Sequence, residues 1–159
     1  MAVENKIRDL IAELNNNGRN IPIDIWGFQD DLGYQLFDDF IEDLSAEKIT
    51  ILRHSREMNR SLFSMLASSK ERSWGVAGQL FFWLGLPCSV ILVAFFGWWF
   101  LLVAPAAYFI GSKLIASSYN SAIFRVAKSS EPGFCLLYYI GQISVGNSEN
   151  YKIAFYEGE

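Results

Sequence analysis

The sequence predicts an α-helical membrane protein, in which a two-span transmembrane helical hairpin is inserted in a small, mostly helical α+β cytoplasmic domain. The first observation is a run of 40 residues, Ser73–Ser112, without Asp, Glu, Lys, Arg or His. One helix needs about 20 apolar residues to cross the roughly 30 Å hydrocarbon core, so this run holds two crossings. The second observation is that amphipathic patterns flank the run on both sides. We therefore expect a cytoplasmic helical segment over 1–72, the hairpin over 73–117, and a cytoplasmic C-terminal segment with a β-hairpin over 118–159.

The N-terminal segment predicts three helices and one strand. Apolar residues at helical spacing predict a helix over 2–15, which the following Asn and Gly residues end. Ile21–Ile25 alternates apolar and polar residues and contains a proline, a pattern typical of an edge strand. A second amphipathic helix is expected over Leu32–Leu44. Ser45 is expected to cap a third helix that runs to about Ser69 and leads into the membrane.

The hairpin is expected to cross the membrane over about 75–95 and again over about 98–116. Gly97 is placed in the turn, because a tight reversal needs a residue that tolerates a positive φ. Trp98 and Trp99 would then lie at the outer interface, where amphipathic aromatic rings are preferred. Pro87 and Pro105 are expected inside the two helices, where each would bend its helix.

Small residues recur at helical spacing in both crossings, so that each set lies on one helical face. Such faces allow two backbones to approach closely. We expect these residues to pack the two helices of the hairpin against each other, and the alternative is a surface for a partner or a second copy. The residues are Gly78, Gly85 and Ser89 in the first crossing and Ala104, Ala107 and Gly111 in the second.

The C-terminal segment predicts a short helix over 117–128, lying along the membrane surface, and then a β-hairpin. Phe134–Val145 and Tyr151–Tyr156 are rich in β-branched and aromatic residues, and a loop of hairpin length separates them. A two-stranded hairpin is marginal on its own in water. We therefore expect it to pack on the N-terminal segment, so that the two segments form one domain.

The charge pattern predicts an integral membrane protein with both termini in the cytoplasm. Residues 51–72 carry five basic and two acidic side chains directly before the apolar run, and Lys113, Arg125 and Lys128 follow it. The turn between the two crossings carries no charge. Because Lys and Arg near helix ends stay on the cytoplasmic side, the turn is expected to face the opposite compartment.

No pattern in the sequence indicates catalysis, a metal or another cofactor. Asp38, Asp39, Glu42 and Asp43 could hold a hard cation, but a solvated acidic helix face is the better interpretation, because such sites also use loop carbonyl oxygens. His54 lies among charged residues without a nucleophile pattern. Nucleic acid is not an expected partner, since the one basic block lies at the membrane and the rest of the segment is acidic.

These observations favour a protein that acts by binding and not as an enzyme. We expect a membrane adaptor or an accessory subunit of a larger membrane complex, whose partners are the lipid bilayer and another membrane protein or a second copy of the chain. Its contact sites would be the small-residue faces and the acidic surface. The alternatives are a protective membrane protein of the exclusion or immunity type, and a hairpin that shapes or permeabilises the membrane. Pore formation is disfavoured because neither crossing has a polar face.

Overall fold

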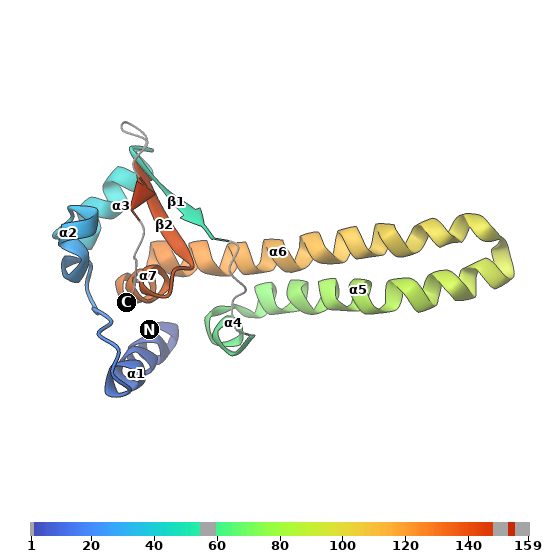
Figure 1. Cartoon of the computed structure of the whole chain (residues 1–159), viewed down its shortest axis with the longest axis horizontal. Coiled ribbons are helices and arrows are strands. Elements are labelled where there is room, and N and C mark those ends of the chain that lie inside the picture. Colours follow the sequence, from blue (N-terminus) through green and yellow to red (C-terminus); the bar gives the residue numbers. More distant parts are fainter. Residues whose placement is uncertain (1, 55–59, 148–152, 155–159) are drawn as a thin grey trace. The chain divides into compact units, whose positions relative to one another are not determined.

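The computed structural model describes residues 2–54, 60–147 and 153–154, and it consists mainly of helices (Figure 1). The chain divides into two compact units. We call Ala67–Ala122 the hairpin unit, and we call Met1–Leu66 together with Ile123–Glu159 the domain unit. The segments that flank the apolar run thus belong to one unit, although they are far apart in the sequence.

The hairpin unit contains two long helices that run side by side (Figure 1). Helix α5 covers Ser69–Phe96, the 3-10 helix η2 covers Trp98–Leu102, and α6 covers Val103–Ser129. Gly97 joins α5 to η2 with a φ of 111°, a conformation that favours glycine. The prediction of two helices long and apolar enough to cross a membrane, with a turn at Gly97, is confirmed.

One detail of the predicted hairpin is wrong. The segment 117–128 is not a separate helix, because α6 continues without interruption to Ser129. Pro105 lies inside α6, as expected, but in the first turn, because α6 begins at Val103 after the 3-10 turn. In the first turn of a helix the backbone N–H has no intrahelical acceptor, so a proline there costs no hydrogen bond. Pro87 does lie inside α5, as expected.

The domain unit begins with four short helical elements. Helix α1 covers Ala2–Asn16, which confirms the predicted first helix. The 3-10 helix η1 spans Ile25–Phe28, α2 spans Gln29–Leu32, and α3 spans Phe37–Ser45. The single helix expected over Leu32–Leu44 is therefore wrong, because Gly33, with a φ of 77°, ends α2 in a left-handed conformation.

A three-stranded antiparallel sheet joins the two ends of the chain in the order β1-β2-β3. Strand β1 covers Ile49–Arg53, β2 covers Ile143–Asn147, and β3 covers Ile153–Ala154. Ile51 is paired with Val145 in β2, and Val145 is paired with Ala154 in β3. The antiparallel C-terminal pair was expected, but the helix predicted over Ser45–Ser69 is wrong. Only α4, Arg60–Leu66, is helical between Ala46 and Ser68 in the described residues.

Ile21–Ile25 does not form the edge strand that its alternation predicted. The side chain of Asn15 binds both backbone groups of Ile21: Oδ1 accepts from the Ile21 N–H at 2.7 Å, and Nδ2 donates to its carbonyl at 3.1 Å. One amide side chain thus supplies the two hydrogen bonds that a neighbouring strand would have made. Ile21 and Ile25 are nevertheless buried, whereas Ile23 between them is 45% exposed.

Helix α7, Glu131–Tyr139, lies at the centre of the domain unit, with every residue from Pro132 to Tyr138 buried. The strand predicted over Phe134–Val145 is therefore wrong in its first half. A helix buried on all sides has no polar face, so its sequence resembles that of a buried strand. Phe134 packs on Phe40 of α3 with ring centroids 4.6 Å apart, and Tyr138 packs edge-on against Phe28 at 5.1 Å.

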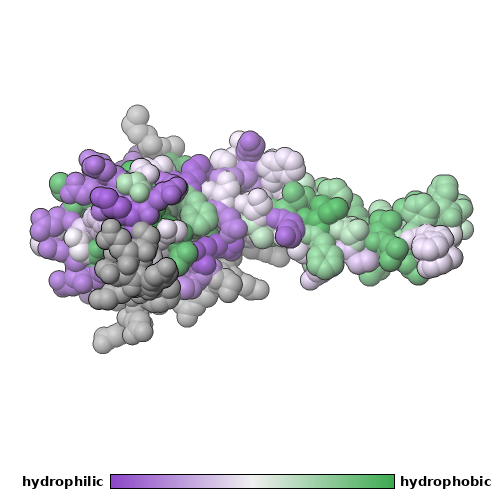
Figure 2. All heavy atoms as spheres, turned by 90° about the horizontal axis from the view of Figure 1, so that it is seen from above, coloured by the Kyte–Doolittle hydropathy of each residue, from purple (hydrophilic) through white to green (hydrophobic). Residues whose placement is uncertain are grey.

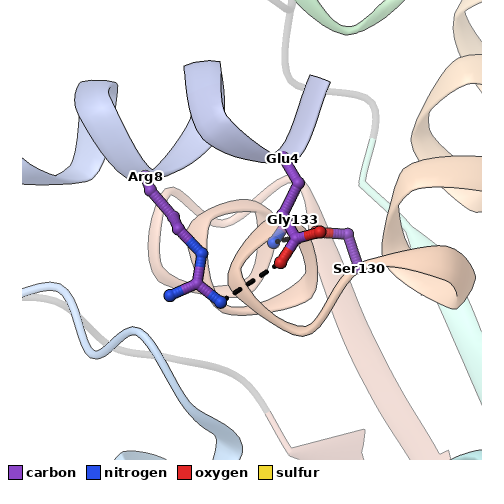
Figure 3. A network of polar contacts seen from close by, with 4 residues as sticks. All are labelled: Glu4, Arg8, Ser130 and Gly133. Atoms are coloured by element: carbon purple, nitrogen blue, oxygen red, sulfur yellow. Dashed lines mark hydrogen bonds and ion pairs between the residues drawn. The ribbon is translucent and has the colours of Figure 1, made fainter. Parts of the chain in front are cut away.

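The start of α7 is held by capping and by α1, which packs on it (Figure 3). Ser130 Oγ accepts from the Gly133 N–H at 3.3 Å, and Glu131 Oε1 accepts from the Ile25 N–H at 2.9 Å. On α1, Arg8 pairs with Glu4 one turn away at 3.1 Å. That ion pair is exposed and adds little stability, so burial of apolar residues holds α1 in place.

Candidate functional site on the apolar hairpin

The small residues predicted from the sequence lie between α5 and α6. Gly78 and Gly111 face each other so closely that a methyl group at Gly78 would lie 2.8 Å from the Gly111 carbonyl oxygen. A methyl group at Gly111 would lie 2.7 Å from the Gly78 carbonyl oxygen. Only glycine permits this approach of two backbones.

The same packing continues toward the turn. A methyl group at Gly85 would lie 2.5 Å from the Ala107 Cβ and 3.7 Å from the Ala104 carbonyl oxygen. Ser89 is 1% exposed, and its hydroxyl donates to the Leu86 carbonyl at 2.7 Å within its own helix. All six predicted residues thus lie in the interface between α5 and α6 or at its edge. We call this interface the seam. This arrangement corresponds to the interpretation that they pack the hairpin.

A carboxylate that sequence reasoning missed lies at the base of the hairpin. Glu71 is 7% exposed; its Oε2 accepts from the Ser68 N–H at 2.7 Å, while Ser68 Oγ accepts from the Glu71 N–H at 3.3 Å. Its Oε1 accepts from Ser121 Oγ of α6 at 3.0 Å. The Ser-x-x-Glu pattern before an apolar run is a capping box and could have been recognised from the sequence. The link to Ser121 could not, because it depends on how the helices pair.

The outward faces of α5 and α6 are apolar and uncovered. Trp83, Phe95 and Phe109 are 72%, 78% and 66% exposed. In the most apolar 18-residue window of each long helix, only 11% of the residues are buried within the structure. Figure 2 shows hydrophobic residues gathered over much of the two long helices. Soluble monomers rarely expose apolar patches of more than several hundred Å².

A groove of about 300 Å³ opens between α5 and α6 beside Gly85 and Ala107. It exists because Gly85 has no side chain and Ala107 only a methyl group, while larger side chains stand on either side. Its lining is apolar throughout apart from one thiol. The lining residues are Leu80, Phe81, Leu84, Gly85, Cys88, Val103 and Ala107.

The acidic residues predicted from the sequence lie in the domain unit, and one of them, Asp43, makes hydrogen bonds within the fold. Asp38, Asp39 and Glu42 are exposed on α3. Asp43 instead accepts hydrogen bonds from Lys48 Nζ at 2.7 Å and from Tyr34 Oη at 2.9 Å. These two hydrogen bonds, that from Lys48 first, lower the pKa of Asp43. Desolvation, reinforced by the Asp43 charge, raises the pKa of Tyr34 to about 12.

The described residues contain no group of three or more His, Cys, Asp or Glu side chains that could hold a metal ion. His54 lies at the end of β1, where its N–H donates to the Gln142 carbonyl at 3.0 Å. Cys88 is exposed in the groove and Cys135 is buried in α7, and neither forms a disulfide. No protein family, curated protein or solved structure matches this chain.

Proposed function

We propose that the chain is a two-pass integral membrane protein whose α5–α6 hairpin crosses the bilayer. The observation that carries the proposal is the pair of long helices that share a charge-free stretch, Ser73–Ser112, and whose large apolar side chains on the outer surface are uncovered. A core helix of a soluble protein would bury those side chains within the chain. In a bilayer, lipid chains cover these side chains, so that no other part of the protein has to pack on them.

The lengths and the ends of the two helices support this proposal. With 28 residues, α5 is about 42 Å long, which exceeds the roughly 30 Å hydrocarbon core and leaves its polar first turn outside. Trp98 and Trp99 lie at the turn and are 59% and 65% exposed, which suits the headgroup region. The basic residues before α5 and in α6 favour cytoplasmic termini and a turn in the opposite compartment.

We propose further that the protein acts by binding, as an adaptor or accessory subunit, and not by catalysing a reaction. The small-residue seam is occupied by the hairpin itself, so a membrane partner would contact the outward aromatic faces. Trp83 on α5 and Phe109 on α6 are suitable contact residues, because both are large and more than three-fifths exposed. Aromatic residues dominate the energetics of protein interfaces.

Topology is tested with single-cysteine variants in a background without Cys88 and Cys135. Gly97→Cys should react with an impermeant thiol reagent on intact cells, whereas Ser45→Cys should react only after permeabilisation. The chain should also stay in the membrane fraction after alkaline extraction. Labelling at position 45 and not at 97 would invert the topology, and release by alkali would contradict insertion.

Binding is tested by photo-crosslinking from positions 83 and 109 in intact membranes. Val76, which is 56% exposed near the base of α5, is the control position. We expect a protein adduct, either with a second copy or with another membrane protein, at 83 or 109. If all three positions give lipid adducts alone, the adaptor proposal is wrong, while the membrane location is unaffected.

A further inference from the structure

We propose that the chain forms a homodimer in the membrane, in which two hairpins pack together as an antiparallel four-helix bundle. The contact face carries Gln79 and Trp83 of α5 and Tyr108 and Ser112 of α6, and we call it the polar face. This inference rests on the proposed insertion into a bilayer. It names a second copy of the chain as the membrane partner.

The polar face lies on the side of the hairpin opposite the groove. Gln79, Tyr108 and Ser112 each come directly after a seam residue, which is a step of about 100° around the helix. Because the two facing helices run in opposite directions, this step leads to the same side of the hairpin on both. The groove residues Leu84 and Val103 instead come directly before a seam residue, so they lie on the other side.

Trp83 and Tyr108 lie at one depth with their polar atoms unpaired. The rings of Phe82 and Tyr108 pack with centroids 5.0 Å apart, so Trp83, the next residue of α5, lies near the level of Tyr108. The two side chains are 72% and 52% exposed. Among the described residues, no hydrogen bond involves the Trp83 indole or the Tyr108 hydroxyl.

This level is inside the hydrocarbon core if the hairpin turn lies at the outer edge of the core. Trp83 lies 13 residues before the end of α5, which is about 20 Å of helix, whereas the core is roughly 30 Å thick. Water is absent at that depth, so an indole N–H and a phenol hydroxyl need protein partners.

Gln79 and Ser112 form a second such pair, about one turn of helix closer to the base of the hairpin. Gly78 approaches Gly111, so the residues that follow them, Gln79 and Ser112, lie at nearly the same level. Ser112 Oγ donates to the Tyr108 carbonyl at 2.8 Å, so its lone pairs can still accept a hydrogen bond. The Gln79 carboxamide is exposed and makes no hydrogen bond to another described residue.

A second copy related by a twofold axis along the membrane normal would satisfy both pairs. Such an axis places α5 of each copy against α6 of the other at the same depth. The Trp83 N–H of one copy would then donate to the Tyr108 hydroxyl of the other, and the Gln79 amide to Ser112 Oγ. Each hydrogen bond occurs twice, and such bonds contribute to the association of membrane helices. A different partner would need matching groups at both depths, whereas a second copy carries them by symmetry.

The experiment measures dimerisation of the full-length protein in vesicles of dioleoyl-phosphatidylcholine, by energy transfer between copies labelled at position 45 in a background without native cysteines. Trp83→Phe and Tyr108→Phe keep the rings and should each raise the dissociation constant about tenfold, the effect of two hydrogen bonds of average strength between membrane helices. The double variant should be no weaker than either single variant, because both changes remove the same hydrogen bonds. The matched control is Trp74→Phe, which removes an indole N–H from the groove side of α5 and should leave the dissociation constant unchanged.

The contact face is tested by disulfide formation between two variants mixed in the same vesicles, again without native cysteines. Gln79→Cys in one copy should form a disulfide with Ser112→Cys in another, because the two positions face each other across the twofold axis. Phe81→Cys with Ile110→Cys is the control pair at a similar depth on the groove side, and it should remain unlinked. A dimer linked through the control pair, or an unchanged dissociation constant in Trp83→Phe and Tyr108→Phe, would overturn the inference.

The outcomes separate this inference from the proposed function. A chain that stays inserted but monomeric at every protein-to-lipid ratio contradicts the homodimer alone. Photo-crosslinking from position 83 that yields only another protein also contradicts the homodimer, while it supports the adaptor proposal. Release of the chain by alkali contradicts the proposed insertion instead.

Discussion

Replacing Gly78 with alanine tests whether the seam holds the hairpin together. The added methyl group would lie 2.8 Å from both the Gly111 carbonyl oxygen and Ile115 Cγ1, and 3.0 Å from the Ile115 backbone nitrogen. Ordinary van der Waals contact begins only at about 3.5 Å. Two of these three atoms belong to the backbone of α6, so rotation of a side chain cannot remove the overlap. The helices have to move apart by several tenths of an ångström.

The expected cost is about 1–3 kcal/mol, the range found when a methyl or methylene group is forced into a well-packed interior. Alanine is a better helix former than glycine by up to about 1 kcal/mol, which offsets part of the loss. The net change is therefore expected to be destabilising by up to about 2 kcal/mol. The matched control is Val76→Ile, which adds a methylene group to a side chain that is 56% exposed on α5. This control should change the stability by less than about 0.5 kcal/mol.

The assay follows separation of the two helices in mixed micelles as the mole fraction of sodium dodecyl sulfate rises. Pyrene labels at Ser73→Cys and Ser117→Cys, in a background without Cys88 and Cys135, report proximity through excimer emission. Gly78→Ala should shift the midpoint to lower detergent fraction, and Val76→Ile should not. An unchanged midpoint for Gly78→Ala, with normal insertion and helix content, would refute close packing of the seam.

Two further predictions concern the domain unit. The raised pKa of Tyr34, about 12 against 10.0 for the free side chain, means that its stabilising contribution is fully present below pH 10 and is lost as the pH rises toward 12. The difference in phenolate absorbance between wild type and Tyr34→Phe reports Tyr34 alone, and its titration midpoint should therefore lie near pH 12. Asp43→Asn should lower this midpoint toward pH 10. A midpoint at pH 10 in the wild type would contradict the hydrogen bond between Tyr34 and Asp43. Burial, reinforced by the charges of Glu131 and Asp24, raises the pKa of the Cys135 thiol. In a Cys88→Ala background, maleimide at pH 8 should thus label Cys135 only as the protein unfolds, and rapid labelling of the native protein would show that α7 is not buried.

Local sequence patterns were sufficient to predict the structure where it depends on one face of a helix or on one residue. The first helix ends at Asn16, one residue from the predicted end, because its apolar stripe is amphipathic and its last residues favour a cap. The reversal at Gly97 was found for a similar reason, since a positive φ in an apolar run is accessible mainly to glycine. The small-residue seam also follows from spacing, because residues three and four apart lie on one face in any helix.

The sequence failed where a segment's partner lies far away along the chain. Ile49–Arg53 forms β1 because it pairs with Ile143–Asn147, a contact across more than 90 residues that no local window contains. Phe134–Tyr139 is a helix because α1, α3 and η1 pack around it and leave no side for a polar face. Ile21–Ile25 is not a strand, because Asn15 binds both backbone groups of Ile21 and Glu131 accepts from the Ile25 N–H.

The sequence by itself determined that this chain has two helices long and apolar enough for a bilayer, where they turn, and which residues allow them to approach each other. These properties depend on composition and on periodicity, which are local. Only the tertiary structure decided that Glu71 meets Ser121, that a groove opens beside Gly85 and Ala107, and that β1 completes the C-terminal sheet. Those features depend on the register between distant segments, and register is set by the mutual fit of surfaces that a linear pattern does not contain.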